Sequence, residues 1–234
     1  PIRTDLTDAE VAAFTAQRWR FPGVDINQRE HRIYPEHALG SHIIGYVSSL
    51  SLNDKKRLDS EGVLALYQGE REIGKVGLER SYEHILHGTP GHETLEITAD
   101  GRSVRTLELI PAHPGKNLRL SVDMNLQSVA ENAMKGKTGA IIAIEPRTGE
   151  ILSFVSLPTY DLNLFPGGID PESWSYLNTA ETKPLLNRAM RGIYPIGSTY
   201  KPFMALAGLE TGAVTADFIL NDTGVFQVGN HRFR

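Results

Sequence analysis

The chain has 234 residues, of which 40% are hydrophobic and 22% are charged, and its formal net charge is −4. This composition is typical of a soluble globular protein with a real core, and the acidic balance argues against a nucleic-acid partner. The absence of cysteine excludes disulfides, thiol catalysis and cysteine metal sites. No apolar stretch is long enough to span a bilayer, and no signal peptide follows Pro1, so we expect any membrane anchor to lie upstream.

The first part of the chain is predicted to mix short helices and strands. Thr7-Asp8-Ala9-Glu10 has the form of a capping box and predicts a helix that begins there. Apolar residues at helical spacing predict a second helix over 76–87, which Gly88 can end. Apolar residues alternate with polar ones over 95–109, on both sides of Asp100-Gly101, and this pattern predicts a hairpin.

A run of turn residues at 111–115 breaks this pattern and predicts the boundary between two domains, 1–115 and 116–234. Beyond it, apolar alternation predicts a short strand over 118–122, and Asp123 can cap the helix that follows.

Two strands and a turn are predicted next: a buried strand over 140–144, a turn at 146–149 and a strand over 151–156. The whole arrangement predicts an α+β fold in which helices pack on an antiparallel sheet. Near the end, 225–228 leads through Gly229-Asn230 into a return strand. We interpret this end, inside a hairpin, as a cut boundary.

Ser198 and Lys201 form the most informative motif, an S-x-x-K element at the mouth of a predicted buried helix over 203–209. Side chains about one turn apart lie on the same face, where an uncharged lysine amine can take the hydroxyl proton. The free N–H groups at a helix N-terminus also favour developing negative charge. On these residues alone, an N-capping serine beside a surface lysine stays an alternative.

Six further segments match one family in order and spacing: 32–35, 41–47, 74–79, 121–127, 145–152 and 158–165. The chain resembles the class B penicillin-binding proteins, most closely their elongation-specific branch, over nearly its whole length. The first three matching segments look like the pedestal, or dimerisation, domain, and the last three look like the opening of the transpeptidase domain.

The resemblance implies a peptidoglycan D,D-transpeptidase that cross-links stem peptides and is acylated by β-lactams. Ser198 would attack the penultimate D-alanine carbonyl, Lys201 would act as the base, and the backbone N–H of Ser198 would be an oxyanion donor. It implies no cofactor and no metal. It also implies a place at the periplasmic face of the inner membrane, with pedestal contacts to a membrane glycosyltransferase and a scaffold protein.

The chain departs from the family in its second and third motifs, S-x-N and K-T-G, which should follow the serine. Literal copies, Ser51-Leu52-Asn53 and Lys137-Thr138-Gly139, precede it. We interpret the first as the start of a short surface helix and the second as a polar turn before a strand. We therefore expect the 234-residue chain alone to show poor or no turnover.

Other interpretations remain open at this stage. His84 and His87, with His92 nearby, could suggest zinc, but no convincing third ligand is visible and a solvated helix face is favoured. A β-lactamase or β-lactam sensor is disfavoured by the long segment before residue 115. A non-catalytic module that docks cell-wall synthesis partners remains the main alternative function.

Overall fold

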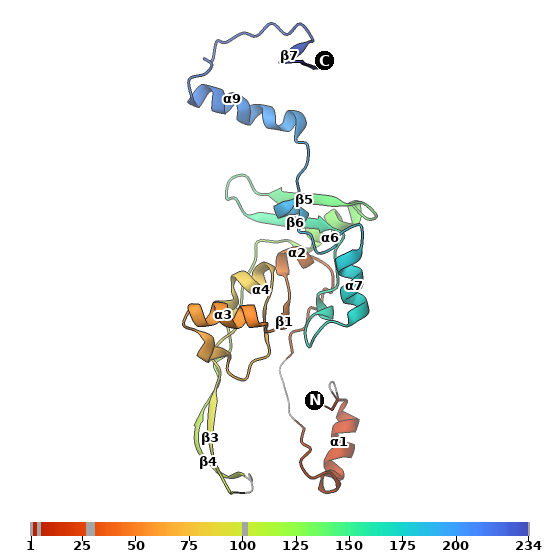
Figure 1. The fold of residues 1–234 in the computed structure, drawn as a ribbon, viewed down its shortest axis with the longest axis vertical. Helices are drawn as coiled ribbons and strands as arrows, with labels where there is room; N and C mark the ends of the chain where they lie inside the picture. The colour runs from red at the N-terminus through yellow and green to blue at the C-terminus, as the bar shows by residue number, and fades with distance from the viewer. Residues whose placement is uncertain (1, 4–5, 27–30, 100–102, 234) are drawn as a thin grey trace. The chain divides into compact units, whose positions relative to one another are not determined.

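The computed structural model describes residues 2–3, 6–26, 31–99 and 103–233 (Figure 1). It divides into two compact units, Pro1–Gly192 and Ile193–Arg234. The part of the chain that is described mixes short helices with two-stranded antiparallel sheets, which confirms the predicted α+β class. Within it, no helix combines the length and the apolar character that crossing a membrane requires.

The first unit opens with α1 (Asp8–Ala16), followed by the 3₁₀ turn η1 (Arg18–Arg20). As predicted, Thr7 caps α1: its hydroxyl accepts from Glu10 N at 3.3 Å, and the Glu10 carboxylate accepts from Thr7 N at 2.9 Å. The next elements are α2 (Ser41–Ile44), β1 (Val47–Ser49), α3 (Leu52–Ser60), η2 (Leu64–Tyr67), β2 (Glu72–Gly74), α4 (Gly77–Ser81), α5 (Glu83–Leu86), β3 (His92–Ile97) and β4 (Ser103–Ile110).

The rest of the first unit contains the predicted helix after Asp123 and the predicted strand pair, followed by helices that were not predicted, and the second unit contains the predicted helix and hairpin. The remaining elements of the first unit are α6 (Met124–Ala133), β5 (Gly139–Ile144), β6 (Ile151–Leu157), η3 (Leu162–Leu164), α7 (Pro171–Thr179) and α8 (Arg188–Arg191). The second unit contains η4 (Gly197–Tyr200), α9 (Lys201–Glu210), β7 (Phe226–Val228) and β8 (His231–Phe233). The hairpins β3–β4, β5–β6 and β7–β8 confirm three predictions, while the expected turn at Asp100-Gly101 lies outside the described residues.

Two predicted elements are wrong. The single helix expected over 76–87 is broken at Tyr82, whose φ of −112° and ψ of 19° separate α4 from α5. The carboxylate of Glu83, at the start of α5, accepts from Gly74 N at 2.8 Å, so a tertiary bond accompanies the break. The strand expected over 118–122 is absent from this described segment, in which Ser121 reaches β6 through its side chain: the hydroxyl donates to Ile151 O at 2.8 Å.

In the sheet β5–β6, strand β6 is more buried than strand β5. In β6, Val155 is fully buried, whereas Ile142 and Ile144 of β5 are 43% and 55% exposed. The predicted burial of 140–144 is therefore only partly correct. Helix α8 contacts both strands, whereas α6 packs mainly on β6, and this packing explains why β6 is the better covered strand.

A buried glutamine of α6 completes the edge of β6. The Gln127 side chain accepts from Phe154 N at 2.8 Å and donates to Phe154 O at 3.0 Å. These are the bonds that a neighbouring strand would make, so the carboxamide stands in for a strand at this position.

Two apolar clusters hold the first unit together. One contains Leu58, Tyr67 and Ile73 and lies entirely within the first half of the chain. The other combines Tyr34, from before residue 115, with residues from after it: Tyr160, Leu162, Phe165 and Leu177. The division into domains 1–115 and 116–234 therefore stays a prediction.

Two glycines meet backbone to backbone where α2 ends and α4 begins. Gly45 and Gly77 have φ angles of 76° and 63°. A Cβ atom on Gly77 would lie 2.7 Å from both Gly45 N and Ile43 O. Both the conformation and the space thus require glycine at this contact.

We expect Gly77→Ala to destabilise the protein by roughly 3 kcal/mol, because overpacking adds to the cost of a positive φ. The matched control is Gly62→Ala, since Gly62 has a φ of 73° but no atom within 4 Å of the position that a Cβ would take. That variant should cost only about 1–2 kcal/mol. Urea unfolding of both variants measures the difference, and equal losses would contradict the steric argument.

A partly buried ion pair joins α3 to the residue after β2. Asp54 accepts from Lys75 Nζ and from Ser51 N, the latter at 2.9 Å. Burial alone would raise the pKa of Asp54, but the hydrogen bonds from Lys75 and Ser51 outweigh it and lower this pKa to about 2. The carboxylate is thus strongly favoured in the folded state.

We expect Asp54→Asn to lower the free energy of unfolding at pH 7 by about 1–2 kcal/mol. Because the folded pKa lies below the unfolded value, the contribution of Asp54 is fully present above about pH 4 and disappears as the pH falls toward 2. The difference between wild type and variant should therefore shrink over that window in urea unfolding. Asp59→Asn, an exposed position of α3, is the control; a pH-independent difference for Asp54→Asn would refute the assignment.

Candidate active site

Ser198 and Lys201 lie at the start of the helix in the second unit. Ser198 is in η4, and Lys201 is the first residue of α9. The N–H of Lys201 donates to the carbonyl of Ser198 and closes a 3₁₀ turn. Residues three apart in such a turn eclipse one another, so both side chains leave the same face.

The approach to Ser198 is shaped by its neighbours. Gly197 has a φ of 56°, which glycine adopts without strain. The Thr199 hydroxyl donates to Ile196 O at 2.6 Å, and Pro202 lies in the first turn of α9, where its missing N–H costs no helical bond. The serine consequently lies at the head of a helix, as the sequence predicted.

The burial expected for this helix is wrong. No residue of α9 is buried, and Phe203, Met204 and Leu206 are 66%, 55% and 56% exposed. The physical reason is that the unit Ile193–Arg234, as far as it is described, contains no second layer of structure that covers the helix. An apolar helix sequence predicts that other residues cover the helix, but it does not identify those residues.

The two motif copies that precede Ser198 have structural roles. Ser51 is the N-cap of α3, and its hydroxyl accepts from Asp54 N at 3.2 Å, which confirms its interpretation as a helix start. Lys137 and Thr138 lie in the irregular segment before β5, as expected.

Of the histidines that suggested zinc, His87 and His92 have different surroundings. The His87 ring packs on the ring of Tyr67 with a centroid distance of 4.1 Å, and His92 is the first residue of β3. Over the described ranges, no group of three or more histidine, cysteine or acidic side chains could hold a metal ion.

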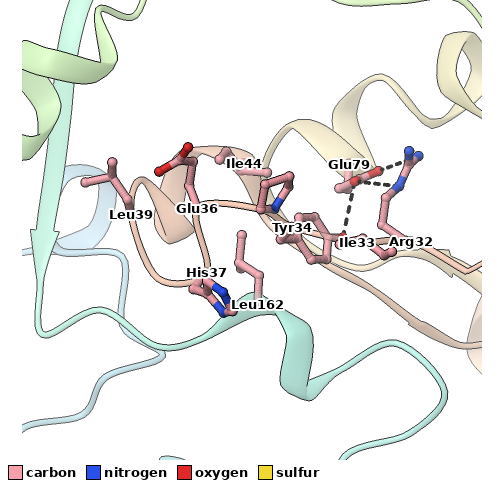
Figure 2. Close-up of a pocket in the computed structure, with 10 residues that line it drawn as sticks. Arg32, Ile33, Tyr34, Glu36, His37, Leu39, Ile44, Glu79 and Leu162 are labelled. Carbon is pink, nitrogen blue, oxygen red and sulfur yellow. Dashed lines mark hydrogen bonds and ion pairs between the residues drawn. The ribbon is translucent and has the colours of Figure 1, made fainter.

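A pocket of about 250 Å³ lies beside the segment 32–39 (Figure 2). Its polar lining includes Arg32 and Glu79, which form an ion pair with Nε to Oε1 at 3.1 Å. The Tyr34 hydroxyl donates to the Glu79 carboxylate at 3.2 Å and accepts from Val47 N at 2.9 Å. Burial raises the pKa of Glu79, and the nearby Arg32 charge opposes that rise.

Neither Ser198 nor Lys201 is among the residues that line this pocket. Both oxygens of Glu79 are within reach of Arg32, which is the arrangement of a structural ion pair rather than of a free base. The sequence analysis did not predict this ion pair, because no local pattern connects Arg32 with Glu79.

Two family models match the chain. The penicillin-binding protein dimerisation domain matches residues 1–120, and the penicillin-binding protein transpeptidase domain matches residues 139–234. The second match contains Ser198 and Lys201.

Curated relatives agree with these models. Peptidoglycan D,D-transpeptidase MrdA of Escherichia coli K12 is 40% identical over 97% of this chain and 36% of its own length. The protein of the same name from Acinetobacter baumannii is 42% identical over 100% of this chain and 34% of its own length. The chain thus spans about a third of the length of these relatives.

Solved structures show the same likeness. A complex between penicillin-binding protein 2 and MreC from Helicobacter pylori has a TM-score of 0.82 and 33% identity, covering 98% of this chain and 42% of that one. Pseudomonas aeruginosa penicillin-binding protein 2 in complex with WCK 5153 has a TM-score of 0.71 and 40% identity, covering 90% of this chain and 42% of that one. The chain therefore belongs to the penicillin-binding proteins, and it carries their dimerisation domain and the start of their transpeptidase domain.

Proposed function

We propose that the chain is part of a peptidoglycan D,D-transpeptidase of cell-wall elongation, with Ser198 as the nucleophile. The observation that carries the proposal is the turn that joins Ser198 to Lys201 at the head of α9, inside the region that matches the transpeptidase model. The relatives named as D,D-transpeptidases support the same reaction class.

In the proposed reaction, Ser198 Oγ attacks the carbonyl carbon of the penultimate D-alanine of a stem peptide. Lys201 takes the hydroxyl proton and passes it to the departing amine as the bond to the terminal D-alanine breaks. An amine of a neighbouring stem peptide then attacks the ester, which restores the serine hydroxyl and forms the cross-link. A β-lactam follows the first half of this path, and its opened ring stays bound as an ester.

The position of Ser198 suits the charge that develops on the carbonyl oxygen. Its own backbone N–H lies at the N-terminal end of the helical segment, where free N–H groups and the helix dipole favour a negative charge. We assign this N–H as one oxyanion donor. No metal and no cofactor enters this mechanism.

We propose residues 1–115 as the pedestal and 116–234 as the N-terminal part of the transpeptidase domain. The family matches at 1–120 and 139–234 support this division. Because the substrate is cell-wall peptidoglycan, we place the whole protein at the periplasmic face of the inner membrane.

A docking role is proposed for the pedestal alongside catalysis. The relative from Helicobacter pylori is solved in complex with MreC, and the match to that structure covers 98% of the present chain. We therefore propose a scaffold protein of this kind as a partner, and a membrane glycosyltransferase as a second partner.

Ser198→Ala should abolish labelling by a fluorescent penicillin, because no other group forms the ester. The protein used is the chain extended to the full length of its relatives, and intact mass spectrometry measures the adduct. Ser51→Ala, which removes the serine of the S-x-N copy, should keep wild-type labelling. Labelling of Ser198→Ala would contradict the assignment of Ser198 as the nucleophile. A wild-type protein that is not labelled but still binds its scaffold partner would favour the non-catalytic module.

Lys201→Gln should lower the rate of penicillin acylation by about 10²–10⁴-fold, which is the usual contribution of a general base. Stopped-flow labelling measures this rate, and thermal unfolding checks that the variant is folded. Lys137→Gln, in the K-T-G copy, is the control and should acylate normally. A Lys201→Gln protein with an unchanged rate would exclude Lys201 as the base.

A further inference from the structure

The hydroxyl of Thr199 makes a hydrogen bond that spans the serine. It donates to Ile196 O at 2.6 Å, so the bond closes a short ring of chain that contains Gly197 and Ser198. Ile196 is the N-cap of η4 and has no side-chain oxygen with which to cap the turn. The Thr199 hydroxyl therefore holds the entrance of the turn from the C-terminal side of Ser198.

The backbone that this bond spans has no other steric restraint at Gly197. The φ of Gly197 is 56°, and no atom lies within 4 Å of the position that a Cβ on it would take. Glycine populates positive and negative φ about equally, so neither its own sterics nor packing at that position fixes the peptide that leads into Ser198. The Thr199 bond therefore restricts a rotation that the backbone itself permits.

The C-terminal side of Ser198 is restrained in a different way. Lys201 N donates to Ser198 O, and Pro202 follows in the first turn of α9 with the fixed φ of its ring. The helix thus holds the backbone of Ser198 on one side, and the Thr199 hydroxyl holds it on the other. These two restraints determine the backbone from which Ser198 Oγ and the Ser198 N–H project.

The Thr199 hydroxyl acts through the backbone rather than on the substrate. A threonine hydroxyl has one proton to donate, and Ile196 O accepts it. While this bond is formed, the hydroxyl can neither donate to a substrate nor pass on the proton of Ser198. Its role therefore differs from that of Lys201, the proposed base.

We propose that Thr199 is a positioning residue for the acylation of Ser198: its bond to Ile196 O fixes the turn that presents the nucleophile and its backbone N–H. The inference rests on the proposed function of Ser198. Because a nucleophile displaced by about 1 Å can lose about 10²-fold in rate, a turn that opens at Gly197 slows the formation of the ester. The loss falls on the acylation step and not on the noncovalent binding that precedes it.

The test removes and then restores this hydroxyl in the protein extended to the full length of its relatives. Thr199→Val keeps the β-branched shape, and we expect it to lower the acylation rate constant at saturating penicillin about tenfold. The dissociation constant of the noncovalent penicillin complex should change less than about twofold. Thr199→Ser keeps a hydroxyl and should recover at least about half of the wild-type rate constant. Stopped-flow labelling over a range of penicillin concentrations measures both constants.

Thr211→Val is the matched control. The Thr211 hydroxyl makes the same kind of bond at the far end of α9, where it donates to Ala207 O at 2.8 Å. This variant removes a hydroxyl-to-carbonyl bond from the same helix but leaves the ring around Ser198 intact, so it should acylate at the wild-type rate. Thermal unfolding of both valine variants separates a loss of stability that they share from a loss of rate that only Thr199→Val shows.

Three results would overturn the inference: a wild-type rate constant for Thr199→Val, a Thr199→Ser variant as slow as Thr199→Val, or an equal loss of rate in Thr211→Val. If Thr199→Val does not fold, Thr199→Ala replaces it, since alanine suits a helical segment at this exposed position, and a wild-type rate constant for Thr199→Ala overturns the inference in turn. In all these cases the wild-type protein is acylated and the proposed function stands. A wild-type protein that no penicillin acylates would instead overturn the proposed function itself.

Discussion

The burial of Tyr34 is the constraint on which the first unit depends. Its ring packs with Tyr160, Leu162 and Phe165, although more than a hundred residues separate these positions along the chain. Burial also removes its hydroxyl, its N–H and its carbonyl from water, and each of these groups finds a protein partner. One residue thus brings an apolar contact and three polar requirements to the same place, and the arrangement of the neighbouring segments satisfies all of them.

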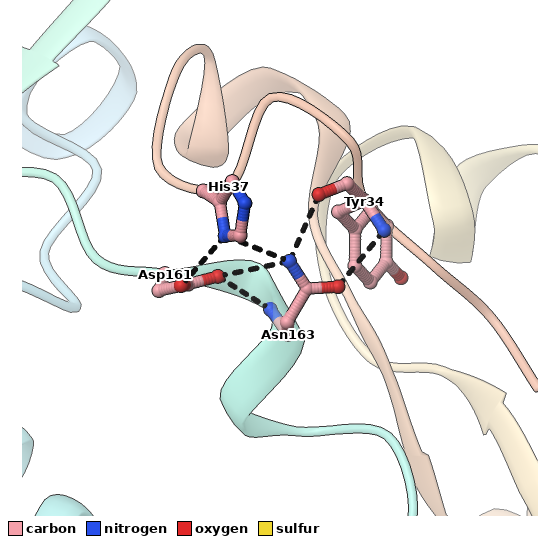
Figure 3. Close-up of polar contacts among 4 residues, drawn as sticks. All are labelled: Tyr34, His37, Asp161 and Asn163. Atoms are coloured by element: carbon pink, nitrogen blue, oxygen red, sulfur yellow. Dashed lines mark hydrogen bonds and ion pairs between the residues drawn. The ribbon is translucent and has the colours of Figure 1, made fainter.

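The charged groups near this ring follow from the same burial. An ionised carboxylate away from water is costly unless it is paired, and Glu79 has Arg32 and the Tyr34 hydroxyl as partners. Burial and the Glu79 charge raise the pKa of Tyr34, so the phenol remains a hydrogen-bond donor. Two carboxamides satisfy backbone groups where no strand is available: Asn163 bonds both backbone groups of Tyr34 (Figure 3), and Gln127 bonds both backbone groups of Phe154.

Local signals in the sequence predicted the elements well, because caps and turns depend on residues a few positions apart. Thr7, Asp123 and Ser51 cap helices, and the three predicted hairpins appear as paired strands. The errors have tertiary causes. Tyr82 interrupts a regular helical pattern beside the bond from Gly74 to Glu83, and α9 is apolar but uncovered. At the candidate site, the spacing of Ser198 and Lys201 could be predicted, whereas the pairing of Tyr34 with Asn163 leaves no periodic signal.

The hairpin β3–β4 contributes no residue to either apolar cluster of the unit. Its strand β3 is exposed along its whole length, and its ladder has register irregularities after Thr94 and after Glu96. Its root, in contrast, is closed by the reciprocal 2.9 Å bonds between Thr89 and His113, next to a close backbone contact between Gly88 and Gly115. Separation of β3 from β4 would therefore expose neither apolar cluster, and the Thr89–His113 bonds mark where the ribbon joins the rest of the unit. Because neither apolar cluster contains a residue of β3 or β4, a partner that binds this ribbon would leave the packing of both clusters unchanged.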